Sequence, residues 1–506
     1  MNIWVSSVHC RRGGGIVGVL AASLLVVAVS PCTASASPTQ SLIFDPGTSA
    51  LGLSIGKRAQ LLQRLSRQGV DVVRMLLPWR QLAPSPEAGE RPEGFDPRNP
   101  SAYRDPLWGA VDHFVTAASA RGMKVMLVPS SPIPNWASAS GSSALEDPLP
   151  DEFQSFVTAV GLRYSGFCDP HNGRENCFLP AFGGESVPLP RVLSWAVWNE
   201  PNLSLFLRPQ FSNGVSQSGR LYRQLFLAAK AGFAASGHGG DRVLIGETSP
   251  GPGVDSTSPL AFLRDVFCLD QNYQPVGGCA PIEASGWGHH PYDPYDPPFA
   301  KSRNLLMVGN LARLRQALSR SARAGATSRV LPVYVTEYGV PTGREGVSRA
   351  TQVKYMAIAE YLLYGYRWVR SSAQYLLNDD PPSSAISFTT GLRVHNGAAK
   401  PSYDAFAMTF LVRRVGARRV RIWGNARPRR GKRTVEVSVK EPVREVHPGR
   451  GTVVRGRLQH LRTVRTNRRG YFSFMARFRP GRRWAAASKL PGGRVLRTSF
   501  VRAYRF

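Results

Sequence analysis

The fold is decided by a short stretch at residues 192–201, VLSWAVWNEP. An apolar run of strand-forming residues stops there at two polar residues and a proline, as a buried strand of a parallel sheet does. The pattern returns at residues 331–339, LPVYVTEYG. Each of the two predicted strands runs directly into a glutamate, Glu200 in the first and Glu337 in the second.

Similar apolar strands alternate with amphipathic helices on either side of these two stretches. The predicted strands are Val70–Leu76, Lys124–Pro129, Val192–Trp198, Arg242–Gly246, Glu283–Trp287, Leu331–Thr336 and Ser372–Leu377. The predicted helices are Lys57–Gln68, Pro106–Arg121, Asp151–Tyr164, Gln217–Ser236, Lys301–Arg323 and Ser348–Tyr366. Alternation of this kind indicates a parallel sheet covered by helices.

The number of strands favours a closed barrel over an open sheet. An eighth strand near Ser41–Leu53 would complete it, although glycines and prolines interrupt that segment. No Gly-x-Gly-x-x-Gly turn follows an early strand, which argues against an open dinucleotide-binding sheet. The predicted fold class is therefore α/β, with a (β/α)8 TIM barrel over residues 37–412.

The pattern changes near Arg413. Helical periodicity stops, and short alternating runs separated by turn residues follow to the C-terminus: Val435–Val439, Gly451–Leu458, Tyr471–Phe478 and Thr498–Tyr504. Such runs predict a small all-β sandwich. A stretch at residues 466–472, TNRRGYF, weakly resembles a turn-and-strand element of bacterial immunoglobulin-like modules. The predicted second domain is an Ig-like module over residues 413–506.

Net charge is concentrated in this module. The whole chain carries +31, and residues 413–506 hold 28 Lys and Arg against three acids, which is +25. Such a module could adhere to an anionic cell-envelope polymer or an acidic polysaccharide, or could simply present a solvated surface. No zinc finger, helix-turn-helix or RNP-like motif indicates specific nucleic-acid binding.

The N-terminus has the pattern of an export signal over residues 1–36. Arg11 and Arg12 precede an apolar run of fourteen residues, and Ala34-Ser35-Ala36 offers a cleavage site. The run is short for a membrane span, which needs about twenty residues, although an uncleaved signal anchor is the alternative. The expected location is extracellular, with a possible association with the cell envelope.

Four cysteines follow the predicted signal, Cys168, Cys177, Cys268 and Cys279. In an exported chain their close spacing favours two local disulfides, Cys168–Cys177 and Cys268–Cys279. A zinc site is the alternative, but neither pair has Cys-x-x-Cys spacing.

Glu200 and Glu337 suggest the chemistry. Active sites of TIM barrels lie at the C-terminal ends of the strands, and these glutamates end the fourth and seventh predicted strands, across the barrel mouth. Glycoside hydrolysis needs such a pair, one carboxyl protonated to serve the leaving oxygen and one ionised to attack. A separation of about 5–5.5 Å would predict retention of configuration and a wider gap inversion.

Three motifs in this order resemble the clan A glycoside hydrolases, families 5 (cellulase-like) and 39 in particular. They are Trp-Asn-Glu-Pro at 198–201, Gly-His-His-Pro-Tyr at 288–292 and Thr-Glu-Tyr-Gly at 336–339. Val72-Val73-Arg74 and Pro134-Asn135-Trp136-Ala137 also fit. The resemblance covers about 350 residues, from Leu51 to about Phe410.

The resemblance implies a role for each matching residue. Glu200 would be the general acid/base and Glu337 the nucleophile. The implied substrate contacts and supporting residues are Asn199 toward the sugar 2-hydroxyl, Arg74 and Tyr292 toward Glu337, and His290 along the cleft. His289 competes with His290. No metal and no organic cofactor are implied.

Other residues are further candidates for contact with a sugar. Aromatic side chains at the mouth are candidate sugar platforms, although each could equally pack under a loop: Trp79, Trp136, Trp287, Tyr292 and Tyr295. Glu247 also ends a strand and is either a substrate contact or unrelated to the chemistry.

Two departures weaken a cellulase assignment. The third strand ends in Ser130-Ser131 without a histidine, and the eighth ends in Asn378-Asp379 where a tryptophan is common in the family. The predicted function is a secreted retaining glycoside hydrolase acting on a polysaccharide or oligosaccharide. The alternative is a non-catalytic protein that binds carbohydrate or polyanions on a barrel scaffold.

Overall fold

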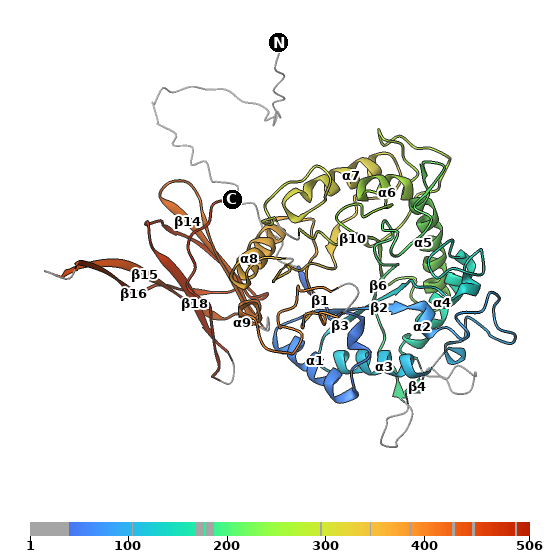
Figure 1. Ribbon diagram of the computed structural model, residues 1–506, viewed down its shortest axis with the longest axis horizontal. Coiled ribbons are helices and arrows are strands. Elements are labelled where there is room, and N and C mark those ends of the chain that lie inside the picture. Colours follow the sequence, from blue (N-terminus) through green and yellow to red (C-terminus); the bar gives the residue numbers. More distant parts are fainter. Residues whose placement is uncertain are drawn as a thin grey trace, which may run out of the picture. The chain divides into compact units, whose positions relative to one another are not determined.

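The computed structural model describes residues 40–103, 105–167, 177–178, 187–293, 296–344, 346–383, 387–427, 431–447, 451–490 and 493–506. The predicted signal at residues 1–36 lies outside these ranges. Figure 1 shows helices arranged around a ring of strands, followed by antiparallel strands in the C-terminal part.

An eight-stranded parallel sheet forms the first part of the fold, and it confirms the predicted barrel. In spatial order its strands are β11 (Val333–Val335), β10 (Gly286–His289), β9 (Arg242–Thr248), β6 (Ser194–Ala196), β3 (Lys124–Ser130), β2 (Val72–Pro78), β1 (Ser41–Asp45) and β12 (Ser371–Tyr375). The segment interrupted by glycines and prolines does supply the eighth strand, β1, which pairs in parallel with β12 and β2.

Short backbone links bring the two ends of this sheet together. The Val333 amide donates to the Trp368 carbonyl at 3.0 Å, and the Arg370 amide donates to the Val333 carbonyl at 2.8 Å. The first and last strands of the order therefore lie side by side. The sheet is nearly closed, so all its C-terminal strand ends face one mouth.

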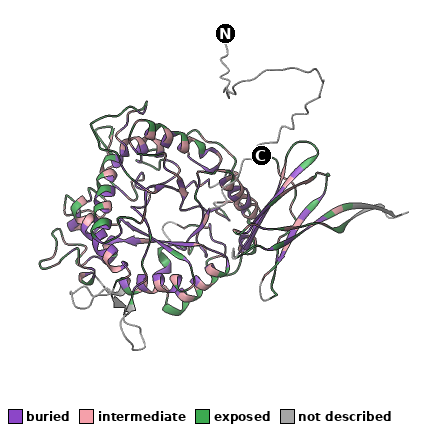
Figure 2. Cartoon of the chain, turned by 180° about the vertical axis from the view of Figure 1, so that it is seen from behind, coloured by how far each residue is buried: buried purple, intermediate pink, exposed green. Residues whose placement is uncertain are grey.

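Helices connect the strands and cover the outside of the sheet. Their bounds are α1 (Ile55–Arg67), α2 (Trp79–Leu82), α3 (Asp105–Ser119), α4 (Pro150–Arg163), α5 (Ser218–Ala235), α6 (Pro259–Val266), α7 (Ala312–Arg323), α8 (Arg349–Gly365) and α9 (Pro401–Ala407). Figure 2 shows buried residues along the strands and exposed residues on the outer faces of the helices. The six predicted helices are all present. However, α7 begins at Ala312, eleven residues later than predicted.

Seven strands in two antiparallel sheets form the C-terminal part. One sheet contains β13 (Met408–Arg414), β14 (Arg419–Ala426) and β17 (Tyr471–Arg477); the other contains β16 (Gly451–Arg465), β15 (Thr434–His447), β18 (Arg483–Lys489) and β19 (Val495–Arg497). Residues 412 and 413, between which the sequence places the domain boundary, both lie within β13.

The two sheets share one apolar core, as a sandwich does. Phe410 of β13, Ile422 of β14, Val437 of β15 and Trp484 of β18 are all buried in it. The predicted strand at Thr498–Tyr504 is reduced to single bridges, of which Trp484 with Val501 is one. The prediction of a small all-β sandwich is confirmed.

Buried contacts join β13 and β14 to helix α8 of the barrel. Arg427 forms an ion pair with Glu360 at 2.5 Å, and Asn425 donates to the same carboxylate at 3.0 Å. Ile358 of α8 belongs to one buried cluster with Leu411 and Trp423. Removing the C-terminal strands would therefore expose apolar surface and unpaired polar groups on α8.

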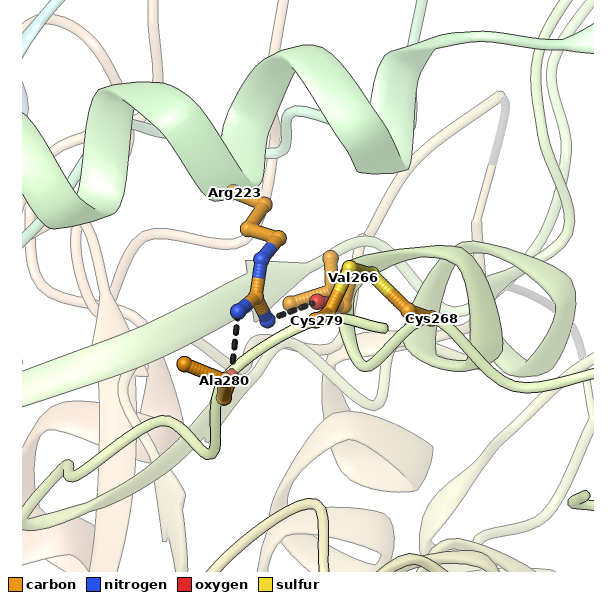
Figure 3. The surroundings of a disulfide bond; sticks show 5 residues. All are labelled: Arg223, Val266, Cys268, Cys279 and Ala280. Carbon is orange, nitrogen blue, oxygen red and sulfur yellow. Dashed lines mark hydrogen bonds between the residues drawn. A yellow bond between two sulfur atoms is a disulfide. The ribbon is translucent and has the colours of Figure 1, made fainter. Parts of the chain in front are cut away.

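The predicted Cys268–Cys279 disulfide is confirmed (Figure 3). The Arg223 guanidinium reaches from α5 to this loop and donates to the carbonyls of Val266 and Ala280. The other predicted disulfide involves Cys168, which lies outside the described residues. None of the helices in the described ranges combines the length and apolar character needed to span a bilayer.

Candidate active site

The mouth of the barrel brings Glu200 and Glu337 together. Glu200 follows β6, and Glu337 follows β11 on the other side of the mouth. A carboxylate oxygen of each lies within 4.8 Å of the other and of a ring nitrogen of His290. Although 137 residues separate the two glutamates, parallel strands of a closed sheet direct both to the same rim.

Arg74 of β2 lies beneath this pair and is fully buried. Its Nη1 donates to Oε1 of Glu337 at 2.6 Å and to Oδ2 of Asp45 at 2.5 Å. Its Nε and Nη2 both donate to Oε2 of Glu247, at 3.2 and 2.9 Å. Burial opposes the charge of Arg74, but the three carboxylates outweigh it and raise the pKa of the guanidinium further.

Arg74 also orients Asn199. Its Nη2 donates to the Asn199 side-chain oxygen at 2.8 Å. The described part of the chain offers no acceptor to the amide nitrogen Nδ2, and Asn199 lines the cavity described below. The amide group therefore has a free donor for a ligand beside Glu200.

Asp45 is the residue that sequence reasoning missed, and Glu247 is one to which it assigned no definite role. Glu247 is fully buried, and although burial alone would raise its pKa, Arg74 and His290 lower it. Burial raises the pKa of Asp45 to about 6, against the opposing effect of Arg74. Both are the polar residues at the ends of predicted strands, which was the available signal, but neither touches the cavity.

His290, and not His289, contacts the carboxylates. Its Nδ1 lies 2.9 Å from Oε1 of Glu200 and 3.8 Å from Oε2 of Glu337, and its Nε2 lies 3.4 Å from Oε2 of Glu247. Burial would lower the pKa of His290, but these carboxylates outweigh it and raise the pKa to about 10. The ring therefore carries a proton at neutral pH.

His289 has different surroundings. Its ring nitrogens lie 2.9 Å from the Thr248 hydroxyl and 2.9 Å from the Leu306 carbonyl. Burial lowers the pKa of His289 to about 4. His289 ends β10 and His290 follows it, and adjacent side chains of an extended chain point in opposite directions. The His289 ring therefore packs inside the barrel wall, whereas the His290 ring faces the acids.

Tyr292 supports Glu337 from the loop after β10. Its hydroxyl donates to Oε2 at 3.0 Å, so that each oxygen of this carboxylate has its own donor. The next residue, Asp293, is buried and accepts a hydrogen bond from the Tyr338 hydroxyl at 3.0 Å. Burial raises the pKa of Asp293 to about 8. This bond ties the loops that carry Tyr292 and Glu337 to each other.

The backbone at the site adopts an uncommon conformation. Trp198, Glu200 and Glu247 have φ values of 64°, 40° and 49°, in the left-handed region that non-glycine residues rarely adopt. The amide of Glu200 donates to the carbonyl of Glu247 at 3.0 Å, which joins two of these positions. Backbone strain of this kind is concentrated at functional sites, where the surrounding structure holds it in place.

A cavity of about 950 Å³ opens over Glu200 and Glu337. The aromatic residues that line it with the two acids are Phe206, Tyr292, Tyr375 and Phe388. Tyr375 stands at the end of β12. It is close to Asn378-Asp379, where a tryptophan is common in the family that the sequence resembles. This volume lies within the range of small-molecule sites.

No protein-family model matches this chain, and no curated protein matches it by sequence. Solved structures do resemble it. A family 39 glycoside hydrolase from Bacteroides cellulosilyticus is 16% identical, with a TM-score of 0.46 over 82% of this chain and 78% of that one. The GH5_18 protein from Streptomyces cattleya is 14% identical, with a TM-score of 0.46 over 73% and 79%.

A monomeric β-xylosidase from Caulobacter crescentus is 15% identical, with a TM-score of 0.43 over 80% and 83%. The neighbours of this fold are clan A glycoside hydrolases. This agrees with the predicted resemblance. At these identities and TM-scores, the argument for what this chain does depends on its own site.

The two predicted tryptophan platforms do not reach the cavity of this barrel, so their prediction as substrate contacts is wrong here. Trp79 is fully buried and stacks on Phe156 with ring centroids 5.1 Å apart. Trp136 packs edge-on against Trp79 at 5.9 Å and donates to the Pro84 carbonyl. Both belong to the aromatic core beneath the loops after β2 and β3.

Trp287 is also buried and points into the barrel wall, where its indole donates to Thr248. Tyr295 lies outside the described residues. Among the described residues, Glu200, His290 and Glu337 form the one group whose ligand atoms lie close enough to hold a metal ion. Arg74 and the protonated His290 already supply positive charge to this group.

Proposed function

We propose that the protein is a retaining glycoside hydrolase, with Glu337 as the nucleophile and Glu200 as the general acid/base. The observation that carries this proposal is the separation of less than 4.8 Å between carboxylate oxygens of the two glutamates at the floor of an open cavity. Retaining enzymes place their two carboxyl groups about 5–5.5 Å apart, whereas inverting enzymes leave room for a water between them.

In the first step, a carboxylate oxygen of Glu337 attacks the anomeric carbon, and the bond to the leaving oxygen breaks. Glu200 gives its proton to that oxygen, so the leaving group departs as a neutral alcohol. In the second step, Glu200 takes a proton from water, the water oxygen attacks the anomeric carbon, and the ester bond to Glu337 breaks. Both glutamates return to their starting states.

The neighbours of the glutamates fit these two roles. The Arg74 guanidinium donates to one oxygen of Glu337, and the Tyr292 hydroxyl holds the other oxygen in place. His290 positions Glu200 through the 2.9 Å contact and holds a proton beside it. The free amide donor of Asn199 is available to the sugar 2-hydroxyl, a contact that strengthens in the transition state.

Replacement of the nucleophile tests the assignment. On 4-nitrophenyl glycosides that the wild type cleaves, Glu337→Gly should lower kcat by ~10³-fold or more, as loss of a covalent catalyst does. Azide should restore turnover and yield a glycosyl azide of inverted configuration. Glu87→Gln, which changes an exposed glutamate, is the matched control and should keep full activity. Unchanged turnover in Glu337→Gly would contradict the proposal.

The alternative function is carbohydrate binding without turnover. It predicts that the wild type binds a sugar, measured by calorimetry, yet hydrolyses no member of a panel of neutral and acidic glycosides. The pairing of Glu337 with Arg74 and Tyr292, and of Glu200 with His290, favours catalysis, because binding alone does not need two carboxylates fixed by buried partners beneath the ligand.

Export of the protein is part of the proposal. The twin arginines, the apolar run and the small-residue site at 34–36 support it, as does the disulfide between Cys268 and Cys279, a bond typical of oxidising compartments. Fractionation of the producing cells, with mass spectrometry of the mature N-terminus, tests this. Full-length protein in the cytoplasm would contradict it.

We further propose that the C-terminal sandwich adheres to an anionic cell-envelope polymer. Exposed cations face each other across paired strands, Arg419 opposite Arg477 and Lys440 opposite Arg483. Like charges directly opposite each other destabilise a sheet. A polyanion lying across either pair would relieve the repulsion.

Paired substitutions test this adhesion. The combination Lys440→Ser, Arg483→Ser should weaken binding to immobilised polygalacturonate or to cell walls, and added salt should abolish binding by the wild type. Lys57→Ser with Arg67→Ser removes two exposed cations of α1 and is the control. Binding that survives high salt would contradict the electrostatic proposal. Tighter binding to DNA at the same salt would contradict an envelope partner.

A further inference from the structure

The loops that line the cavity divide into two chemically different halves. The loops after β3, β6, β9 and β10, which are neighbouring strands, present six large apolar side chains: Leu145, Leu203, Leu205, Phe206, Pro252 and Leu305. The half formed by the loops after β11 and β12 contributes Glu337, two apolar residues, Pro341 and Phe388, and the hydroxyl groups of Tyr375, Ser387, Thr389 and Thr390. One half is therefore apolar and the other carries hydroxyl groups.

Glu200 belongs to the apolar half by chain connectivity. The Leu203 amide donates to the Glu200 carbonyl at 2.9 Å, and the Phe206 amide donates to the Leu203 carbonyl at 3.0 Å. The acid and the apolar wall are thus parts of one tight turn. Because the acid protonates the leaving oxygen, the leaving group must lie beside Glu200, on the apolar side of the cavity.

The rim of this half also exposes apolar side chains. Leu205 is 49% exposed, and Val254 in the loop after β9 is 87% exposed. The Ser204 hydroxyl donates to the Val254 carbonyl at 3.1 Å, which holds the two loops together. The apolar surface therefore continues from beside Glu200 out to the rim.

A second sugar would find few partners in this half. Its described polar side chains are Ser131, Asn199, Glu200, Ser249 and Tyr292. The Ser249 hydroxyl already donates to the Gly251 carbonyl, and the Tyr292 hydroxyl to Glu337. Each hydroxyl of a sugar that is buried without a partner costs binding free energy. An alkyl or aryl group, by contrast, gains by covering this wall.

Charge narrows the substrate further. Among the described residues that line the cavity, the charged side chains are the two catalytic acids, and no Lys or Arg is present. Carboxylated, sulfated or phosphorylated sugars would therefore find no cationic side chain in the described lining. The sugar bound at this site should be neutral.

We infer that the substrate is a neutral glycoside with an apolar aglycone, an amphiphile whose alkyl or aryl part rests on the wall beside Glu200. This inference rests on the proposed hydrolase function and names its substrate class. Cleavage transfers the glycone to water and releases the apolar alcohol, which takes its proton from Glu200.

A series of alkyl glycosides tests the inference. After a 4-nitrophenyl panel has identified the preferred neutral glycone, its methyl, butyl and octyl glycosides are compared below their critical micelle concentrations, together with a disaccharide of the same glycone. The value of kcat/KM should rise with chain length, by about fourfold for each methylene that becomes fully buried. The octyl glycoside should exceed the disaccharide although a sugar alcohol is the better leaving group.

Leucine substitutions locate the effect. Leu203→Ser with Leu205→Ser should lower the octyl-to-methyl ratio of kcat/KM about tenfold or more. Leu193→Ser is the matched control, since it changes a leucine of similar exposure (51%) that does not line the cavity.

Failure of the inference differs from failure of the proposed function. Turnover without dependence on chain length, or a preference for the disaccharide, would overturn the apolar substrate and leave the hydrolase in place. Absence of turnover on every glycoside would overturn the hydrolase. In that case, calorimetry with octyl and methyl glycosides still tests whether the apolar wall binds the alkyl group. Equal affinities for the two glycosides would contradict such binding.

Discussion

Cations are used differently in the two parts of the molecule. In the barrel, Arg74 and His290 are fully buried and each contacts several carboxylates. In the sandwich, many arginines lie on exposed strand faces, and some stand opposite one another. Buried charges with fixed partners interact strongly and are screened little, whereas exposed charges interact weakly through water and are screened further by salt.

This contrast explains why net charge misleads as an indicator of function here. The +25 of residues 413–506 dominates the composition. Yet the proposed chemistry uses two buried cations, Arg74 and His290, in the other part of the chain. Four substitutions measure the difference between the two parts, and they follow from the largest expected effect to the smallest.

Arg74→Met should have the largest effect. It leaves Glu247 and Asp45 buried without their cation, which destabilises the fold by about 3–5 kcal/mol, as breaking a buried ion pair does. Loss of the charge beside Glu337 should also lower kcat/KM by ~10³-fold. Thermal unfolding and aryl-glycoside kinetics measure both effects.

Two controls accompany this variant. Arg91→Met breaks the more exposed pair with Glu152 and should change stability by ~1 kcal/mol or less. Arg74→Lys keeps a positive charge beside the carboxylates. If Arg74→Met does not fold, the effect on kcat/KM can still be measured in this variant. Equal stability losses in Arg91→Met and Arg74→Met would remove the distinction between buried and exposed cations.

His290→Gln should have the second largest effect. Because the folded-state pKa of about 10 lies above the ordinary 6.5, the stability that the protonated ring contributes is full below pH 6.5 and lost as the pH rises toward 10. The wild-type Tm should therefore fall as the pH rises from 6.5 to 10. In His290→Gln, the part of this fall that comes from deprotonation of the ring should be absent. We expect kcat/KM to drop about a hundredfold.

His289→Gln is the matched control, because His289 is equally buried but contacts no carboxylate. It should keep the wild-type dependence of Tm on pH between 7 and 10. A His290→Gln variant with that same dependence would show that the ring carries no proton in the folded protein.

Asp293→Asn should have a smaller effect on stability, and in the opposite direction. Burial disfavours the charge of Asp293, and none of the described residues places a cation beside it. The folded-state pKa of about 8 exceeds the ordinary 3.8, so wild-type stability is full below pH 3.8 and falls as the pH rises to about 8. The amide keeps an acceptor for Tyr338. At pH 8 its Tm should exceed that of the wild type by a few degrees, with less gain at pH 5; a constant difference would contradict the assignment.

Arg457→Ser with Arg494→Ser should have the smallest effect. Both side chains are exposed in the sandwich. The free energy of unfolding should change by no more than about 0.5 kcal/mol. Urea denaturation measures this change. A loss of several kcal/mol would show that these exposed arginines stabilise the fold as strongly as the buried cations Arg74 and His290 do.

Much of the fold could be predicted because its signals are local. Alternating strands and helices predict a barrel, and even the interrupted segment near Ser41 forms its expected strand. Strands β13 and β14 were not predicted separately, because their apolar residues pack partly against α8 and lack a simple alternation. The contact between α8 and the sandwich joins segments that are distant in the chain.

The candidate site could be predicted in its centre but not in its surroundings. Glu200 and Glu337 stand out because each directly follows an apolar strand. Asp45 and Glu247 have a weaker signal, since a polar residue at a strand end has many possible roles. Trp79 misled because an aromatic residue near the mouth has the same sequence signature whether it faces the cavity or packs beneath it.

The sequence by itself determined the strand pattern, the rim on which the two acids lie and the concentration of positive charge near the C-terminus. These properties depend on neighbouring residues and on the geometry common to all parallel barrels. Only the tertiary structure decided that Arg74 joins three carboxylates, that His290 rather than His289 faces them, and that an apolar wall adjoins Glu200. These contacts depend on register and loop paths, which bring together side chains that lie far apart in the chain.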